Sequence, residues 1–257
     1  MSKRVFQRIF QEFKSKAVKL PKEVKIFEMG PRDGLQNEEQ ILSLDFKLKM
    51  IHDLVDAGVK YIEAGSFVSP KWIPQMANTT EIFAQLQRKE GVTYSALVPN
   101  LIGMRKALES GVKEVAVFTA ASESFTKKNV NASIDQTIKN FEEVIAEANK
   151  AGVKVRGYVS CVLGCPYEGE VSPQKVNEVT KRLLDIGCYE VSLGDTIGKG
   201  TPQTTTKLFD ALTVDPKFLA AHFHDTYGNA FENLLIALQR GVSVIDSSVA
   251  GIGGCPY

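Results

Sequence analysis

Two of the three histidines in this 257-residue chain stand one residue apart, in the stretch AHFHDTYG at positions 221–228. The residues before them are apolar, which favours a strand. Because successive side chains of a strand alternate between its faces, His222 and His224 are expected to point the same way. Two imidazoles on one face either share a ligand or repel each other when protonated. The residues that the fold brings to that face decide between these outcomes.

A candidate partner lies near the N-terminus, in GPRDGLQNE, where Arg32 is followed by Asp33 and by Gly34, which is expected to adopt a positive φ. Two neutral imidazoles and one carboxylate can bind Mg²⁺, Mn²⁺ or Zn²⁺, and the lack of adjacent thiolates weakens the case for zinc. Arg32 would then be free to face an oxyanion. The simpler alternative is a hydrogen-bonded core histidine and an aspartate that caps a helix. We favour the metal site because a His-x-His pair and an aspartate occur together.

A repeated pattern predicts the elements that must position these residues. A helix-like segment, a glycine and a β-rich run recur at Gly58, Gly91, Gly111, Gly152, Gly187 and Gly241. Glycine commonly ends a helix in the left-handed conformation, and β-branched residues after it favour a strand. Residues 24–29 and 219–225 bring the number of predicted strands to eight. Strands that alternate with helices predict a (β/α)₈ TIM barrel, with an open doubly wound sheet as the alternative. The open sheet is disfavoured because no G-x-G-x-x-G turn follows the first strand.

The carboxyl ends of the strands carry further ionisable residues, at the end of a barrel where active sites gather. Glu63 falls on the second strand, Asp195 ends the sixth, and Cys255 lies in the glycine-rich loop after the eighth. Glu63 and Asp195 could instead be interior carboxylates that pair with lysines. Cys255 is the best candidate for a reactive thiol because its neighbours favour an exposed turn.

Composition and charge limit the class of protein. The net charge of +1 argues against a nucleic-acid or membrane role. Residues 1–23 are basic, with apolar residues at helical intervals, and resemble either an amphipathic transit peptide or a solvent-exposed N-terminal helix. Residues 24–257 are predicted to form the barrel domain. The four cysteines suggest free thiols in a reducing compartment, and the spacing of Cys161 and Cys165 favours packing over zinc binding.

The predicted eighth strand runs to about residue 250, and the sequence ends at Tyr257. We therefore expect a barrel without its eighth helix and C-terminal region, as in a truncated product. One flank of the barrel would then need another covering.

Several long motifs identify a resemblance. GPRDGLQNE, SFVSPKWIPQM, ASESFTKKN, RGYVSCVLGCPYEG, SLGDTIG, HFHDTYG and SSVAGIGGCPY, taken together and in this order, resemble the 3-hydroxy-3-methylglutaryl-CoA lyase family. The resemblance covers residues 24–257. The related isopropylmalate and homocitrate synthases share the Arg-Asp pair and the His-x-His pair, but their other segments resemble this sequence less.

This resemblance implies metal-dependent cleavage of 3-hydroxy-3-methylglutaryl-CoA to acetoacetate and acetyl-CoA, in ketogenesis and leucine degradation. It implies that Asp33, His222 and His224 hold Mg²⁺ or Mn²⁺, and that the ion acidifies the substrate hydroxyl. The expected partner is a small acyl-CoA substrate, with no nucleic acid and no membrane, and the chain is expected to form a homodimer. The basic leader and the role of the family favour the mitochondrial matrix, with the cytoplasm as the alternative.

The resemblance also implies roles for the other candidates. Arg32 would stabilise the enolate that forms when the carbon–carbon bond breaks, and Cys255 would assist its protonation. Glu63 and Asp195 would orient the substrate and the metal ligands. An asparagine beyond the Cys255 loop completes the metal ligands in the family, and this sequence ends before it. The remaining alternatives are a truncated, non-catalytic form and a related condensing synthase.

Overall fold

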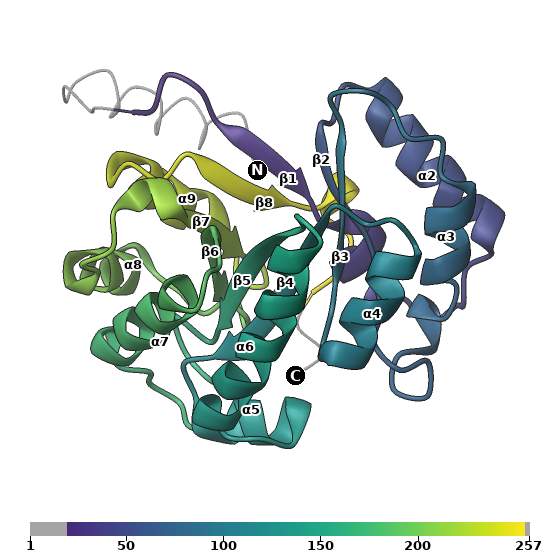
Figure 1. The fold of residues 1–257 in the computed structure, drawn as a ribbon. Coiled ribbons are helices and arrows are strands. Elements are labelled where there is room, and N and C mark those ends of the chain that lie inside the picture. The colour runs from purple at the N-terminus through teal and green to yellow at the C-terminus, as the bar shows by residue number, and fades with distance from the viewer. Residues whose placement is uncertain (1–19, 255–257) are drawn as a thin grey trace.

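A closed barrel of eight parallel strands forms the centre of the computed structural model, which describes residues 20–254 (Figure 1). Each strand pairs with the next along the sequence, and β1 pairs with β8 to close the barrel. The strands are β1 (Lys25–Glu28), β2 (Tyr61–Ser66), β3 (Thr93–Leu97), β4 (Glu114–Ala120), β5 (Lys154–Ser160), β6 (Glu190–Asp195), β7 (Leu219–Phe223) and β8 (Val244–Ser247). This topology confirms the predicted barrel and excludes the open sheet.

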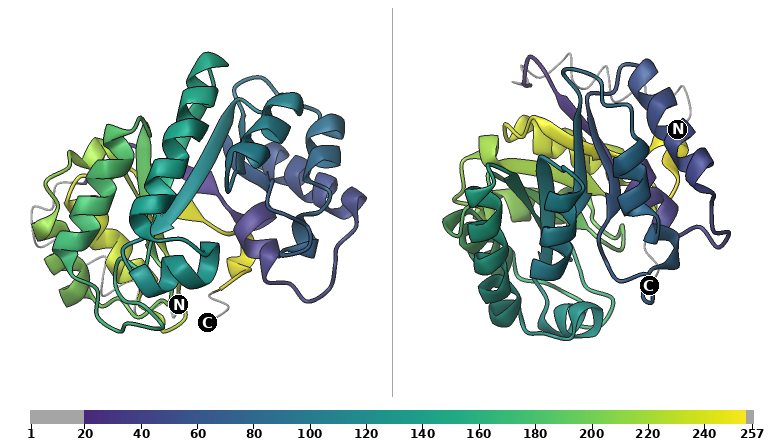
Figure 2. Two further views of the ribbon diagram at one scale, coloured as in Figure 1. Left: turned by 60° about the horizontal axis from the view of Figure 1, so that its bottom comes forward. Right: turned by 45° about the vertical axis from the view of Figure 1, so that its right-hand side comes forward.

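Helices surround the strands on the outside of the barrel (Figure 2). They are α2 (Leu44–Asp56), α3 (Thr79–Gln85), α4 (Leu101–Glu109), α5 (Glu123–Val130), α6 (Ile134–Lys150), α7 (Pro173–Asp185), α8 (Pro202–Ala211) and α9 (Ala230–Gln239). A π-helical turn, η1 (Gly30–Gly34), follows β1, and a 3₁₀ turn, η4 (Val249–Gly251), follows β8. Within residues 20–254, no α-helix follows β8.

The repeated glycines act as the sequence pattern predicts. All six have a positive φ, for example 98° at Gly58 and 92° at Gly241. At the other end of the helices, short polar side chains accept hydrogen bonds from the first turn, as Ser133 does from the backbone N–H of Gln136 at 3.1 Å. Local sequence therefore sets where many of the helices begin and end.

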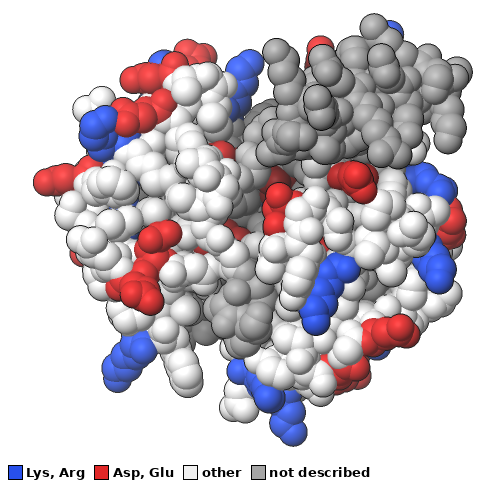
Figure 3. Space-filling view, turned by 180° about the vertical axis from the view of Figure 1, so that it is seen from behind, with Lys and Arg blue, Asp and Glu red and all other residues white. Residues whose placement is uncertain are grey.

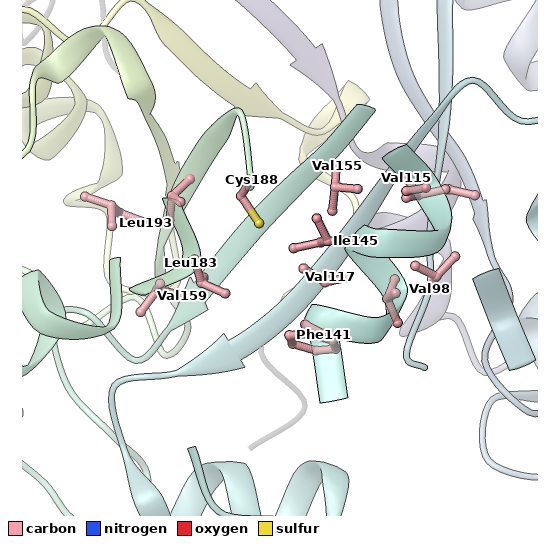
Figure 4. Close-up of a cluster of buried hydrophobic side chains, with 14 of the residues drawn as sticks. Val98, Val115, Val117, Phe141, Ile145, Val155, Val159, Leu183, Cys188 and Leu193 are labelled. Atoms are coloured by element: carbon pink, nitrogen blue, oxygen red, sulfur yellow. The ribbon is translucent and has the colours of Figure 1, made fainter. Parts of the chain in front are cut away.

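The main hydrophobic core lies between the strands and the outer helices (Figure 4). On α6, the longest helix described, Ile134, Ile138, Phe141 and Ile145 recur at intervals of four and three residues and are all buried. Figure 4 shows Phe141 and Ile145 facing valines of the neighbouring strands. Burial of a phenylalanine at such a site contributes about 3–5 kcal/mol. This layer holds the barrel strands in register.

The barrel contains both apolar and charged buried side chains. A small apolar cluster there includes Phe27 and Met29 of the first strand segment. Beside it lie charged side chains that are almost completely excluded from solvent, with Arg156 at 1% and Glu63 at 0% exposure. Buried charges require partners, so these residues must bind each other or a ligand. Their pairing determines the geometry at the carboxyl end of the barrel.

Three local expectations need correction. Gly34 is absent from the residues with positive φ; a side chain there would instead collide with Ile252 and Ser248, so close approach is what requires glycine. The eighth strand ends at Ser247, and η4 occupies the positions expected to complete it. The seventh strand ends at Phe223, so His224 lies one residue beyond it.

The distribution of charge on the surface agrees with the near-zero net charge of the sequence. On the face seen in Figure 3, the described Lys and Arg side chains lie interspersed with Asp and Glu. None of the helices in residues 20–254 is long and apolar enough to cross a membrane. Cys165 and Cys188 are buried free thiols, as expected, and Cys161 is also buried. The predicted leader falls almost entirely outside the described residues.

Candidate metal centre at the carboxyl end of the barrel

The turn η1 positions Arg32 and Asp33. Backbone N–H groups of both residues donate to the carbonyl oxygen of Met29, at 3.1 and 2.7 Å. Glu28 also holds the turn η1: its Oε1 accepts hydrogen bonds from Gly30 N and from Val249 N, both at 2.8 Å. The first strand, the π turn and the loop after β8 are therefore tied together by one buried carboxylate.

The two histidines lie on the same side of β7 and face Asp33. Their ring centroids are 5.2 Å apart. Asp33 Oδ2 is 3.4 Å from His222 Nε2 and 3.9 Å from His224 Nε2. This confirms that the His-x-His pair points one way. It also confirms that barrel closure brings the segments after β1 and β7 together, with only β8 between them.

Asp33, His222 and His224 form the one group in residues 20–254 whose His, Cys, Asp or Glu donors could together hold a metal ion. One donor atom from each lies within 4.8 Å of the others. Adjacent ligands of a six-coordinate Mg²⁺-sized ion lie about 3 Å apart, so small movements of these side chains would bring them to coordination distance. The side chains are half-buried, which leaves room for substrate or water on the open side. The donor set therefore fits a divalent cation.

Arg32 lies against this cluster and is held by two carboxylates. Its Nε donates to Glu63 Oε1 and its Nη1 to Asp33 Oδ1. The other oxygen of Glu63 accepts from the Tyr158 hydroxyl at 2.8 Å. Among the described residues, Arg32 Nη2 has no hydrogen-bond partner. The guanidinium is thus fixed in place with one donor nitrogen left for a ligand.

The charges of the cluster shift the pKa values of its members in different directions. Burial opposes ionisation of Asp33, but Arg32 and the histidines outweigh it and hold the pKa of Asp33 well below its usual value. Burial would also lower the pKa of His222, yet its hydrogen bonds to Asp246 and Asp33 raise it to about 9. Burial and the neighbouring His222 lower the pKa of His224 to about 4. At neutral pH the metal-free pair therefore carries a single positive charge, on His222, and the neutral His224 has a lone pair to donate.

Sequence reasoning missed two residues behind the histidines. Asp246 Oδ2 lies 3.0 Å from His222 Nδ1, on the side of the ring away from Asp33. Asp246 is in turn held by Arg156 at 2.7 and 3.0 Å. The available signal was a charged residue in the interior of each of two predicted strands, Arg156 in KVRGYVS and Asp246 in SVIDSS. Such residues inside a barrel must be paired, but the sequence does not show with what.

The other residues predicted for the site are Glu63, Asp195 and Cys255, and the two of them that the structure describes are not among the candidate metal ligands. Glu63 is fully buried and contacts Arg32, as described above. Asp195 is fully buried at the end of β6, where its Oδ2 accepts from Gly200 N at 2.8 Å, and burial raises its pKa. In the described part of the chain it makes no hydrogen bond to Arg32 or to the metal cluster; it orders the loop after β6. Cys255 lies outside the described residues.

The fold and the site together define a (β/α)₈ barrel with a candidate divalent-metal centre beside a fixed arginine. The HMGL-like family model matches residues 23–255. A hydroxymethylglutaryl-CoA lyase named as mitochondrial, from Macaca fascicularis, is 58% identical over 240 residues, which are 93% of this chain and 74% of that protein. A 3-hydroxy-3-methylglutaryl-CoA lyase named as cytoplasmic, from Rattus norvegicus, is 53% identical over 93% of this chain and 70% of its own length.

A solved structure agrees with these relatives. The crystal structure of hydroxymethylglutaryl-CoA lyase from Pseudomonas aeruginosa superimposes with a TM-score of 0.90 at 56% identity, covering 93% of this chain and 80% of that one. This chain belongs to the HMGL-like family.

Proposed function

We propose that the protein is a carbon–carbon lyase that cleaves 3-hydroxy-3-methylglutaryl-CoA to acetoacetate and acetyl-CoA, a reaction of ketogenesis and leucine degradation. The observation that carries the proposal is the convergence of Asp33, His222 and His224 beside an arginine with a donor to spare. The relatives named as lyases of this substrate support it.

The metal in this proposal is Mg²⁺ or Mn²⁺, held by Asp33, His222 and His224. Oxygen and imidazole donors without thiolates suit these ions. When bound, the cation would supply Lewis acidity toward the hydroxyl and carboxylate oxygens of the substrate. Because Asp33 is ionised and lies at the cluster, it is placed to accept the proton of the substrate hydroxyl. The carbonyl of acetoacetate forms as the carbon–carbon bond breaks.

The electron pair of the broken bond moves toward the thioester oxygen as an enolate. Arg32 Nη2 is the donor placed to stabilise that oxygen, because Glu63 and Asp33 occupy the other sides of the guanidinium. Glu63, itself held by Tyr158, keeps Arg32 in position. Cys255 is proposed to supply the proton that converts the enolate to acetyl-CoA. Asp195 is proposed to act through the loop after β6, which it orders.

The physiological setting is also part of the proposal. The substrate is an acyl-CoA and the active form a homodimer, which light scattering on the purified chain would test. Relatives are named as both mitochondrial and cytoplasmic. The basic residues 1–23 lead us to propose the mitochondrial matrix, and import of a fusion of these residues to a reporter would test it.

One assay separates this lyase from a related condensing enzyme. The purified chain is incubated with Mg²⁺ and either 3-hydroxy-3-methylglutaryl-CoA or acetyl-CoA with a set of 2-oxo acids. We expect acetoacetate in the first mixture and no free CoA in the second. CoA release only in the second would contradict the proposal.

A further inference from the structure

The side of His222 that faces away from the metal cluster is occupied by one carboxylate. Asp246 is buried, with its side chain 1% exposed, and its Oδ2 lies 3.0 Å from His222 Nδ1. The same oxygen accepts from Ser192 Oγ at 2.8 Å. The two nitrogens of this imidazole thus face two different acidic groups, Asp246 on one side and Asp33 on the other.

Asp246 is itself fixed by Arg156, whose side chain is 1% exposed. Arg156 binds it with both terminal nitrogens, at 2.7 Å to Oδ1 and 3.0 Å to Oδ2. The third guanidinium nitrogen, Nε, donates to Glu190 Oε1 at 2.8 Å, and the group lies 4.6 Å from the centroid of the Phe27 ring. A planar guanidinium that is held on three sides has a single orientation. The carboxylate that it binds through two hydrogen bonds therefore has a single orientation too.

Each hydrogen bond that links Arg156, Asp246 and His222 has a defined donor and a defined acceptor. Both oxygens of Asp246 accept from a guanidinium, so the carboxylate is ionised and can only accept. Its contact with His222 must therefore be a bond donated by Nδ1–H. In a neutral imidazole, the form that binds a metal, a proton on Nδ1 leaves the lone pair on Nε2. That atom is the one directed at Asp33.

We propose that Asp246, oriented by Arg156, is a positioning residue that keeps a proton on His222 Nδ1 and so directs the Nε2 lone pair into the metal cluster. The inference rests on the metal role proposed above for His222. Without the carboxylate, a neutral His222 could place its proton on either nitrogen, and only one of these tautomers can bind the ion through Nε2. Loss of such an outer partner typically lowers metal affinity about 10–100-fold.

Nitrogen NMR of the unaltered protein tests the tautomer directly. The chain has three histidines, so selective ¹⁵N labelling gives a simple spectrum, and a His52→Gln variant assigns the signal from the histidine outside the site. In the Mg²⁺-saturated protein we expect His222 to carry its proton on Nδ1 and none on Nε2. A spectrum with Nε2 protonated and Nδ1 bare would overturn the proposal. This measurement needs no variant of the network to fold.

A matched pair of variants tests the consequence for the metal. Asp246→Asn removes the charge that faces His222, whereas Ser192→Ala removes another partner of the same oxygen and leaves the carboxylate in place. Electron paramagnetic resonance of Mn²⁺ measures affinity without any assay of turnover. We expect Asp246→Asn to weaken Mn²⁺ binding about 10–100-fold. Ser192→Ala should change it by less than about threefold.

A folded Asp246→Asn variant that binds Mn²⁺ as tightly as the unaltered chain would overturn the positioning role. These experiments also distinguish a failure of the Asp246 role from a failure of the proposed lyase activity. A chain that binds Mn²⁺ with His222 in the expected tautomer, but releases no acetoacetate, contradicts the lyase activity and leaves the role of Asp246 standing. A chain with the opposite tautomer that still releases acetoacetate from 3-hydroxy-3-methylglutaryl-CoA contradicts only the role of Asp246.

Discussion

Arg32 and Glu63 form a buried ion pair that joins the turn after β1 to the neighbouring strand β2, with Arg32 Nε donating to Glu63 Oε1. Because this contact uses Nε and the contact with Asp33 uses Nη1, the guanidinium has a single orientation at the edge of the metal cluster. Arginine can satisfy two carboxylates and still present a donor to substrate, whereas the compact ammonium of lysine cannot do so with the same geometry.

Arg32→Lys is therefore expected to lower kcat by about 10²–10³ without unfolding the protein, since loss of one donor to a developing oxyanion has that effect. Steady-state kinetics and circular dichroism measure the two quantities. The control is Arg88→Lys, at an arginine that binds the backbone carbonyls of Ser110 and Gly111. If the two variants retained equal turnover, Arg32 would have no special role.

Metal binding is expected to stabilise the folded chain. At a concentration one hundred times Kd, a ligand that binds only the native state adds about 2.7 kcal/mol to the free energy of unfolding. Urea unfolding with and without Mn²⁺ should show this increase in the unaltered chain and in Asp53→Asn, an exposed site on α2. Asp33→Asn should lose it. The same increase in Asp33→Asn would place the metal elsewhere.

Arg156→Met is expected to destabilise the fold by about 3–5 kcal/mol, because it leaves Asp246 buried without its guanidinium partner and Glu190 with only its ion pair to Lys25 at 3.7 Å. Arg182→Met removes a surface pair with Asp135 and should cost about 0–1 kcal/mol. Urea denaturation compares the two. Equal, small losses would mean that the interior charges are not coupled to stability.

The buried carboxyl group of Glu114, which is not part of the metal cluster, is expected to make the stability of the fold depend on pH. Burial raises its pKa although the Tyr189 hydroxyl donates to it at 2.8 Å. The folded state therefore binds this proton more tightly than the unfolded state, so the contribution of Glu114 to stability is present at low pH and is lost as pH rises through the raised pKa.

Gln at position 114 keeps a carbonyl acceptor for Tyr189 but cannot ionise. We expect the stability of the unaltered chain relative to Glu114→Gln to fall as the pH rises above the ordinary glutamate pKa of 4.5 and through the raised pKa, as measured by urea unfolding at several pH values. Glu109→Gln, at an exposed position on α4, should show a smaller change. A difference between the unaltered chain and Glu114→Gln that is constant with pH would contradict the argument.

Much of the architecture follows from local sequence. Glycines such as Gly58 and Gly241 occupy the positive-φ positions that end helices, and the residues after them pair as strands. The common direction of His222 and His224 follows from the two-residue period of a strand. Once eight strands are recognised, closure brings Asp33 to the same place, because chain order and strand order coincide.

The network inside the barrel depends on contacts that chain order does not reveal. Asp246 reaches Arg156 from a strand three places away around the barrel, and the sequence does not specify that register. Gly34 illustrates the same limit: glycine there is required by a neighbour 214 to 218 residues away, at Ser248 and Ile252, and not by its own φ. Long-range packing, unlike helix caps, cannot be inferred from one segment.

The most direct test measures acetoacetate released from 3-hydroxy-3-methylglutaryl-CoA by the purified 257-residue chain, with Mg²⁺ or Mn²⁺ and after chelation, for the unaltered protein and Asp33→Ala. We predict acetoacetate and acetyl-CoA in equal amounts, dependence on the added ion, and loss of turnover in Asp33→Ala. Turnover that persists in folded Asp33→Ala, or is indifferent to the chelator, would contradict a metal centre built on Asp33, His222 and His224.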